Sequence, residues 1–181
     1  MALLPEVKKH YGRQWFLING EWVLPQATVM EENRNPATAE VISEFAVATE
    51  EEARAAVEAA HEAFKSWREV PMRDRARLLF DMRAKFEEHF EELCRVLTQD
   101  HGRTIEEARG SVRRVIENIE SACSALYDIR KMNEHLYDVA RGIDEYLTFE
   151  PLGAFLIITP GNIPMHAWSS FVPYALAAGC T

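Results

Sequence analysis

The chain has 181 residues, of which 48% are hydrophobic and 27% charged, and its formal net charge at pH 7 is −9. This length and composition are typical of one globular domain, or of part of a larger one. The negative charge argues against a protein that binds nucleic acids or anionic membrane surfaces through its overall field. Prolines and polar residues interrupt the richest apolar stretch, so no segment is predicted to cross a membrane.

The cysteines, the histidines and the amino terminus bear on the compartment and on metal binding. Cys94, Cys123 and Cys180 are an odd number without short spacing, which favours reduced thiols in a cytoplasm over a disulfide scaffold. The six histidines show no metal-ligand spacing, so no metal site is predicted. The first ten residues lack a basic start followed by an apolar core, so we expect no signal peptide.

The first part of the chain is predicted to form strands. Residues 15–24 hold two β-prone runs around Asn19-Gly20, the dipeptide that most favours a two-residue type I′ hairpin turn. Asn35-Pro36-Ala37-Thr38 is a turn by composition. Residues 40–47 then alternate as in a strand that buries one side better than the other. One side of that strand carries, in order, Val41, Ser43, Phe45 and Val47.

Three amphipathic helices are predicted between residues 49 and 126. Thr49-Glu-Glu-Glu52 and Thr104-Ile-Glu-Glu107 are capping boxes, in which threonine and glutamate side chains accept from each other's backbone amides. Apolar residues follow each box, and also follow Pro71, at the steps of three and four that mark one helix face. We expect the middle helix to run from Pro71 to a carboxyl cap at Gly102. The apolar stripes are interpreted as core and the charged faces as solvated surface.

The carboxyl-terminal part of the chain is predicted to combine strands, a loop and a helix. Residues 143–150 are predicted as a strand after a polar connection. Ala154 to Ile158 is an unbroken apolar run, too short for a typical helix, which predicts a strand buried on both faces. Two prolines and a glycine make residues 159–164 a sharp loop, and residues 165–178 form one apolar helix that ends at Gly179. Ligands of such strand–loop–helix units collect just past the carboxyl end of the strand.

The motifs of this region resemble those of one enzyme family. Pro151-Leu-Gly, five apolar residues, Thr-Pro-x-Asn162-x-Pro, Trp168, and Pro173-x-Ala-Leu-Ala-Ala-Gly-Cys-Thr181 are similar to the start of the cofactor domain of NAD(P)-dependent aldehyde dehydrogenases. The Asn-Gly-Glu-Trp hairpin and the Asn-Pro-Ala-Thr turn occur in the same order in that family. The resemblance covers the chain from about Trp15 onward, but only roughly the amino-terminal third of the family's usual length.

The resemblance implies an α/β fold, the amino-terminal part of a Rossmann-type cofactor domain. Residues 1–142 would form its hairpin and helical layer, and residues 151–181 its first and incomplete βα unit. Residues 143–150 would extend away from the cofactor domain and pair with a neighbouring subunit, so a homo-oligomer is implied. The helix segment Ile119-Glu-Ser-Ala-Cys-Ser-Ala looks closest to the methylmalonate-semialdehyde dehydrogenase branch.

The family's chemistry assigns roles to five residues. An aldehyde is oxidised with NAD or NADP through a cysteine thiohemiacetal, and the acyl group leaves to water or to coenzyme A; the sequence leaves both choices open. By resemblance, the side-chain amide of Asn162 would donate to the thiohemiacetal oxygen. From the residues alone, a cap on the following helix or an Asx turn explains Asn162 as well. Ile158, Thr159, Pro160 and Gly161 would line the nicotinamide side of the cofactor.

The family's nucleophile is missing from these residues. No cysteine here has a Gly-Gln-x-Cys context; Cys94 and Cys123 are interpreted as core residues, and Cys180 follows a helix end. We therefore expect the 181 residues alone to lack dehydrogenase activity. The alternative is a truncated, non-catalytic chain that acts as an oligomerisation or binding module. Such a module would have to cover the apolar segments 154–158 and 166–178 with a partner.

Overall fold

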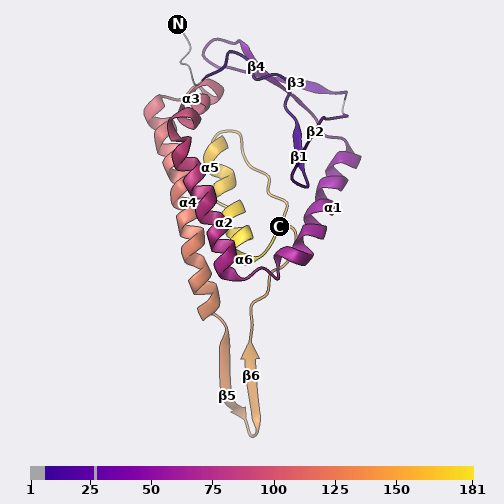
Figure 1. The fold of residues 1–181 in the computed structure, drawn as a ribbon, viewed down its shortest axis with the longest axis vertical. Coiled ribbons are helices and arrows are strands. Elements are labelled where there is room, and N and C mark those ends of the chain that lie inside the picture. Colours follow the sequence, from indigo (N-terminus) through magenta and orange to yellow (C-terminus); the bar gives the residue numbers. More distant parts are fainter. Residues whose placement is uncertain (1–6, 27) are drawn as a thin grey trace.

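Strands and helices alternate in blocks along residues 7–26 and 28–181, the part of the chain that the computed structural model describes (Figure 1). The strands pair as three separate antiparallel two-stranded sheets. They are β1 Phe16–Ile18 with β2 Glu21–Val23, β3 Met30–Arg34 with β4 Val41–Ala46, and β5 Glu134–Ala140 with β6 Ile143–Leu147. The helices are α1 Glu50–Trp67, α2 Met72–Glu88, α3 Phe90–His101, α4 Ile105–Lys131, α5 Pro164–Ser169 and α6 Val172–Ala178.

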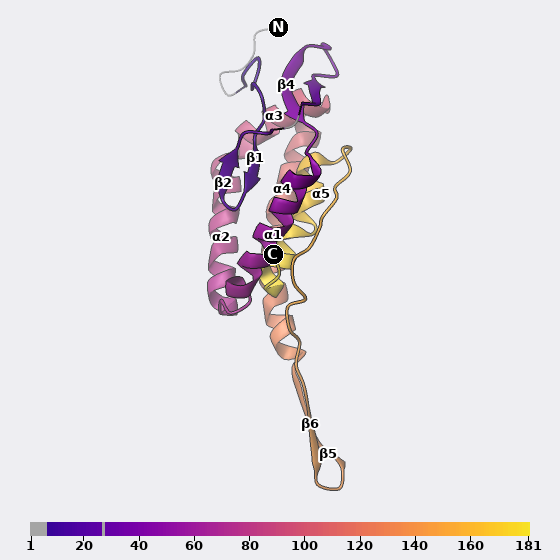
Figure 2. The same ribbon diagram turned by 90° about the vertical axis from the view of Figure 1, so that its right-hand side faces the viewer.

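The elements form a helical body with one projecting arm. In Figures 1 and 2, α2 and α3 follow one another along α4, and α5 and α6 lie against this layer, while α1 stands on the other side of the carboxyl-terminal segment. The β5–β6 hairpin extends from the end of α4, away from every other element. The chain then returns from β6 along the body towards α5. This return brings the loop before α5 close to the α3–α4 connection.

The core is built on one face of α4. Val112, Val115 and Ile119 are fully buried and Ile116 is 1% exposed. The amino-terminal part of this face packs against Cys94 and Leu97 of α3, and the carboxyl-terminal part packs against α2 and α6. The predicted stripe is therefore confirmed as core. The amphipathic spacing of α4 places these β-branched side chains where helices from both directions can reach them.

The predicted helix caps and the predicted hairpin turn are confirmed. Thr49 and Thr104 are N-caps, and in both capping boxes the threonine and glutamate bonds are present. Gly102 ends α3 in the left-handed conformation with φ 78°. Asn19 and Gly20 have φ values of 53° and 76°, and Ile18 pairs with Glu21, as a type I′ turn requires.

Two of the expected helices are each divided into two helices in the structure. The helix expected from Pro71 to His101 is interrupted at His89, whose φ of −102° and ψ of 15° divide α2 from α3. The apolar spacing continues across this point, so periodicity could not reveal it. The helix expected over residues 165–178 is α5 and α6, separated at Ser170 and Phe171. Pro173 explains this break, because it has no N–H to donate to a preceding turn.

The expected strand over residues 154–158 is also corrected, since this segment has no regular secondary structure. Among the described residues its backbone pairs only with Thr181: the Phe155 N–H donates to the Thr181 carbonyl at 2.6 Å, and the Thr181 N–H donates to the carbonyl of the preceding Gly153 at 3.3 Å. Leu156 is 82% exposed instead of buried on both faces. A strand is defined by ladders to its neighbours, and among the described residues this segment has one paired residue beside it.

The structure shows pairings and buried faces of the other strands that the sequence did not indicate. The residues before Gly142, expected as a polar connection, form β5, which pairs with the expected strand β6. Strand β3 was not predicted, because Met-Glu-Glu-Asn-Arg shows no apolar alternation. In β4 the buried side carries Ile42 and Ala46, while Phe45 is 40% exposed. A register shift beside Arg34 in the paired strand accompanies this arrangement.

Membrane-spanning helices and metal-binding clusters are both absent from the described residues. None of their helices combines the length and the apolar character needed to cross a membrane. No group of three or more histidine, cysteine or acidic side chains lies close enough together to hold a metal ion. The residues before position 7, on which the expectation of no signal peptide partly depends, lie outside the described part.

The capping box of α4 yields the first prediction. Thr104→Ala removes the acceptor for the Glu107 amide, so we expect the free energy of unfolding to fall by about 1 kcal/mol. Urea denaturation followed by circular dichroism measures this change. Thr148→Ala, in the exposed segment after β6, is the matched control and should change stability by less than about 0.5 kcal/mol. Equal losses in the two variants would contradict the capping role.

Candidate functional site

Asn162 lies in the exposed loop that leads into α5. Residues 158–162 are all exposed, and the helix begins only at Pro164. The N-cap position is Ile163, and no side chain caps the helix. Asn162 is therefore not the helix cap that the residues alone allowed. Its side-chain amide makes no hydrogen bond with the described residues, so it is free to bind a ligand.

Arg103 connects this loop to the helical body. Its Nη2 donates to the backbone carbonyl of Asn162 at 2.8 Å. Its Nη1 donates to the Ser111 Oγ at 2.5 Å, and its Nε donates to the His101 Nδ1 at 3.2 Å. The guanidinium therefore joins the end of α3, the first turns of α4 and the loop before α5. Sequence reasoning missed Arg103, because the residue it binds lies 59 positions along the chain.

A polar cavity of about 600 Å³ opens beside Arg103. Arg103 and Arg114 contribute two guanidinium groups, and Glu107 contributes a carboxylate. The carboxylate is already engaged, because the Glu107 Oε2 accepts from the Thr104 backbone N–H, and this bond lowers the pKa of Glu107. The remaining lining residues are His101, Gly110, Ser111 and His166. The bond from Thr104 keeps the carboxylate charged, but two guanidinium groups against one carboxylate still leave the lining with a net positive charge, which favours an anionic ligand.

Helix α5 is fixed behind the loop by polar and aromatic contacts. The Asn118 Nδ2 of α4 donates to the Ser169 Oγ at 2.9 Å, and Ser169 is fully buried. The Ser169 Oγ in turn donates to the His166 carbonyl at 2.8 Å. Trp168 packs on Phe86 with a ring separation of 5.6 Å, which makes it a core residue. The loop thus enters a helix whose position is set by α4.

The residues expected to contact a cofactor form an open strip just before Asn162. Ile158 is 83% exposed, and Thr159, Pro160 and Gly161 are exposed too. Their backbone groups make no hydrogen bond with the described residues. A Cβ built on Gly161 would have no neighbour within 4 Å. Free backbone groups and open space fit a flat ligand that is held through the main chain.

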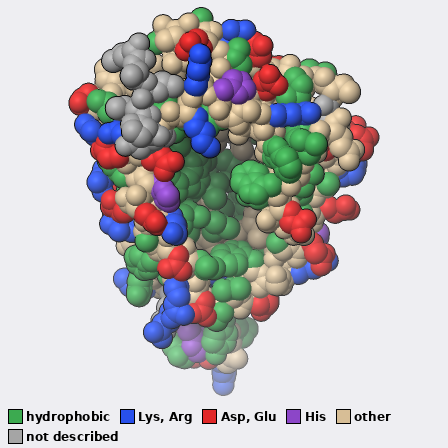
Figure 3. Space-filling model, turned by 45° about the horizontal axis from the view of Figure 1, so that its top comes forward, with side chains coloured by type: hydrophobic (Ala, Val, Ile, Leu, Met, Phe, Trp, Pro, Cys, Tyr) green, Lys and Arg blue, Asp and Glu red, His purple; other side chains and the backbone are tan. Residues whose placement is uncertain are grey.

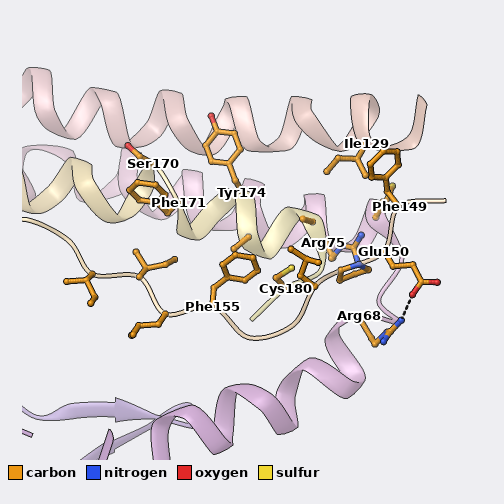
Figure 4. Close-up of a pocket in the computed structure, with 18 residues that line it drawn as sticks. Arg68, Arg75, Ile129, Phe149, Glu150, Phe155, Ser170, Phe171, Tyr174 and Cys180 are labelled. Atoms are coloured by element: carbon orange, nitrogen blue, oxygen red, sulfur yellow. Dashed lines mark hydrogen bonds and ion pairs between the residues drawn. The ribbon is translucent and has the colours of Figure 1, made fainter. Parts of the chain in front are cut away.

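A second cavity is an apolar groove of about 910 Å³ on the inner side of the returning segment. Hydrophobic side chains gather in the hollow of the surface in Figure 3, and Figure 4 shows the groove residues between α4, α6 and the segment after β6. Arg68 at its rim forms an ion pair with Glu150 at 3.2 Å. Phe155 and Tyr174 are among the side chains that face into it.

Arg75 is the unusual residue of this groove. It is only 5% exposed, and its Nε has no hydrogen-bond partner among the described residues. Burial lowers the pKa of its guanidinium, and the neighbouring Cys180 opposes this effect. Gly179 allows the close approach, because a Cβ there would lie 2.6 Å from the Arg75 Nη1. A buried guanidinium without a paired carboxylate is costly unless acceptors surround it.

The three cysteines do not form part of the Asn162 site. Cys94 is fully buried against α4, and Cys123 and Cys180 are 5% and 3% exposed. Burial raises the pKa of the Cys94 thiol to about 11 and also raises the pKa of Cys123. A nucleophilic cysteine needs an accessible thiolate. The interpretation of Cys94 and Cys123 as core residues is confirmed.

Comparisons with known proteins identify the family to which the chain belongs. The aldehyde dehydrogenase family model matches residues 22–181, which is most of the chain. The chain belongs to the aldehyde dehydrogenase family, and its fold is the amino-terminal part of that family's α/β cofactor-binding region.

Within that family, the chain is similar to semialdehyde dehydrogenases. It is 40% identical over 164 residues to malonate-semialdehyde dehydrogenase 2 of Oceanobacillus iheyensis, covering 91% of this chain and 33% of that protein. The same-named protein of Geobacillus thermodenitrificans is 41% identical, with 91% and 34% covered. The chain thus spans about a third of the length of the curated relatives it matches.

Solved structures show the same fold. The crystal structure of methylmalonate-semialdehyde dehydrogenase from Oceanimonas doudoroffii matches with a TM-score of 0.84 and 36% identity, covering 90% of this chain and 33% of that one. A double mutant of betaine aldehyde dehydrogenase from Staphylococcus aureus, solved with NAD⁺, matches with a TM-score of 0.85 and 29% identity. That match covers 93% of this chain and 33% of the other.

The buried cysteines give the second prediction. At pH 8 a thiol whose pKa is about 11 is a thiolate in only about one molecule in a thousand, so the native Cys94 should react very slowly with a disulfide reagent. At pH values below the pKa the Cys94 thiol is mostly protonated, so the rate of its modification should rise with pH up to about 11. A colorimetric thiol assay with and without denaturant measures this. Rapid native modification at neutral pH would contradict the burial.

Proposed function

We propose that this chain is the amino-terminal part of an enzyme that oxidises an aldehyde with NAD or NADP through a cysteine thiohemiacetal. The cysteine nucleophile would lie outside these residues. The observation that carries the proposal is the Asn162 loop, because it places an exposed amide donor with no other partner beside a strip of free backbone. Family membership supports the reaction class.

In the proposed reaction, the Asn162 side chain donates to the oxygen of the tetrahedral intermediate. Negative charge develops on that oxygen only as the nucleophile adds, so a neutral donor binds the transition state better than the aldehyde. The backbone of Asn162 is already engaged by Arg103, which leaves the side chain for the substrate. This division of roles suits a rigidly held donor.

Ile158, Thr159, Pro160 and Gly161 would hold the nicotinamide end of the cofactor, which accepts the hydride when bound. Their exposed, unpaired backbone offers hydrogen bonds, and Gly161 leaves room for a ring to approach. One matching crystal structure, of betaine aldehyde dehydrogenase, is described as a complex with NAD⁺. The contacts of this strip do not distinguish NAD from NADP.

The polar cavity beside Arg103 supports a semialdehyde substrate. The names of the curated relatives specify malonate semialdehyde, an aldehyde that also carries a carboxylate. Arg114 lines the cavity, and its exposed guanidinium contacts only Glu117 among the described acids, at 3.5 Å. It therefore has donors to spare for a carboxylate. We assign Arg114 the recognition of the acid end, and leave water and coenzyme A open as acyl acceptors.

We also propose a role for each part of the chain. Residues 1–142 would supply the hairpin and helical layer, residues 143–150 the contact to another subunit, and residues 151–181 the first part of the cofactor unit. The projecting β5–β6 hairpin is exposed on both faces, which supports homo-oligomer formation. A two-stranded ribbon is only marginally stable on its own in water.

The alternative function is a non-catalytic binding or oligomerisation module, which the apolar groove of about 910 Å³ favours. The intact mass of the gene product purified from its source through an amino-terminal tag separates the two functions. A mass near 20.7 kDa, with association but no NADH formation, would support the module. A mass several-fold larger, together with NADH formation from an aldehyde, would support the enzyme.

The third prediction concerns Asn162 in an enzyme that carries these residues and its nucleophile. Asn162→Ala should lower kcat by about 10²- to 10³-fold with little change in KM, because the donor acts mainly in the transition state. Steady-state NADH formation measures this. Asn162→Asp, which keeps the shape but repels an oxyanion, should be at least as slow. Asn133→Ala, at the base of the distant hairpin, is the control. A full kcat in Asn162→Ala would contradict the role.

The fourth prediction concerns Arg114. Arg114→Gln should raise KM for malonate semialdehyde by roughly 10- to 100-fold, because a charge-assisted hydrogen bond is lost. KM for an uncharged aldehyde such as propanal should stay the same. Arg113→Gln is the matched control, since Arg113 binds Glu87 and does not line the cavity. An equal rise in KM for both aldehydes would exclude carboxylate recognition by Arg114.

A further inference from the structure

We propose that Arg103 is a positioning residue for the proposed reaction, which fixes the backbone of the Asn162 loop so that the side-chain amide points at the reacting oxygen. The inference rests on the proposed function, in which Asn162 is the oxyanion donor. Arg103 itself does not touch the substrate in this account. It acts through the carbonyl of Asn162, the same residue whose side chain is assigned the chemistry.

The three acceptors of Arg103 determine its orientation. Nη2 binds the Asn162 carbonyl at 2.8 Å, Nη1 binds the Ser111 Oγ at 2.5 Å, and Nε lies 3.2 Å from the His101 Nδ1. Because the guanidinium is planar, bonds from three different nitrogens leave it no freedom to rotate. The position of the Asn162 carbonyl is thereby tied to α3 and α4.

The backbone of Arg103 is fixed as well. Gly102 closes α3 with φ 78°, and its N–H donates to the Thr98 carbonyl at 2.9 Å. Thr104 opens α4 with a complete capping box. Arg103 is the single residue between these two caps. Its side chain therefore starts from one of the most constrained points of the backbone.

The loop has no comparable attachment of its own. Among the described residues, the bond from Arg103 is the only hydrogen bond that reaches residues 159–162 from another element, since the turn at residues 161–162 is local. Helix α5 has six residues and no side-chain cap, so it cannot order the loop from its own end. Without Arg103 the loop would be held only by its chain connections. A displacement of about 1 Å at a catalytic group can cost 10²-fold in rate.

A double-mutant cycle in the complete enzyme tests this inference. Arg103→Ala should lower kcat about 10- to 100-fold with KM little changed. In an Asn162→Ala background the same change should cost nothing further, because the two residues act as one unit. Free guanidinium ions should restore part of the kcat of Arg103→Ala. Arg109→Ala, which breaks an exposed ion pair to Glu91, is the control and should keep kcat. Additive losses would overturn the inference.

A second measurement separates this inference from the proposed function. Amide hydrogen exchange by mass spectrometry should show faster exchange at His166 and Ala167, whose N–H groups donate to the Ile163 carbonyl at the end of the loop, in Arg103→Ala, and unchanged exchange in Arg109→Ala. Unchanged exchange in Arg103→Ala would show that Arg103 does not hold the loop. Faster exchange with full activity in Asn162→Ala would refute the catalytic role of Asn162 and leave Arg103 as an anchor without catalytic consequence.

Discussion

The burial of one face of α4 is the constraint on which the rest of the structure depends. α2, α3, α5 and α6 all contact this helix, and its four central β-branched residues are almost completely removed from water. Burial of such side chains is worth roughly 1.5–3 kcal/mol each. The same helix supplies Ser111 to Arg103 and Asn118 to Ser169. The core, the Arg103 contact to the Asn162 loop and the contact that holds α5 therefore share one rigid element, and the position of the candidate site is set by hydrophobic packing.

Local signals predicted much of the fold because their physics is local. The two capping boxes, the Asn19-Gly20 turn and the Gly102 cap each depend on atoms within a few residues, and all were correct. The strand expected at residues 154–158 depends on partners far along the chain, and there the apolar pattern was insufficient. The break at His89 was hidden for a different reason, because an apolar stripe continues through it.

The residues of the candidate site likewise fall into those that a local motif indicates and those that only the structure brings together. The loop around Asn162 could be identified from a motif, since its prolines, glycine and asparagine are close together in the sequence. Arg103, Arg114 and His166 could not, because nothing in the sequence shows that the α3–α4 connection lies beside a loop 59 residues away. The apolar spacing of α4 predicts that the helix is buried but not what its polar edge meets. The charged lining of this cavity could therefore be recognised only in the three-dimensional arrangement.

Arg75 makes the apolar groove selective about what can cover it. The Nε of Arg75 is already buried without a partner, and a purely hydrocarbon cover would remove the rest of the guanidinium from water without compensating its charge, at a cost of roughly several kcal/mol. A surface that brings a carbonyl or carboxylate oxygen to the same depth would turn that cost into a charge-assisted hydrogen bond. A cover of this groove is therefore expected to combine apolar contacts with one oxygen acceptor for Arg75.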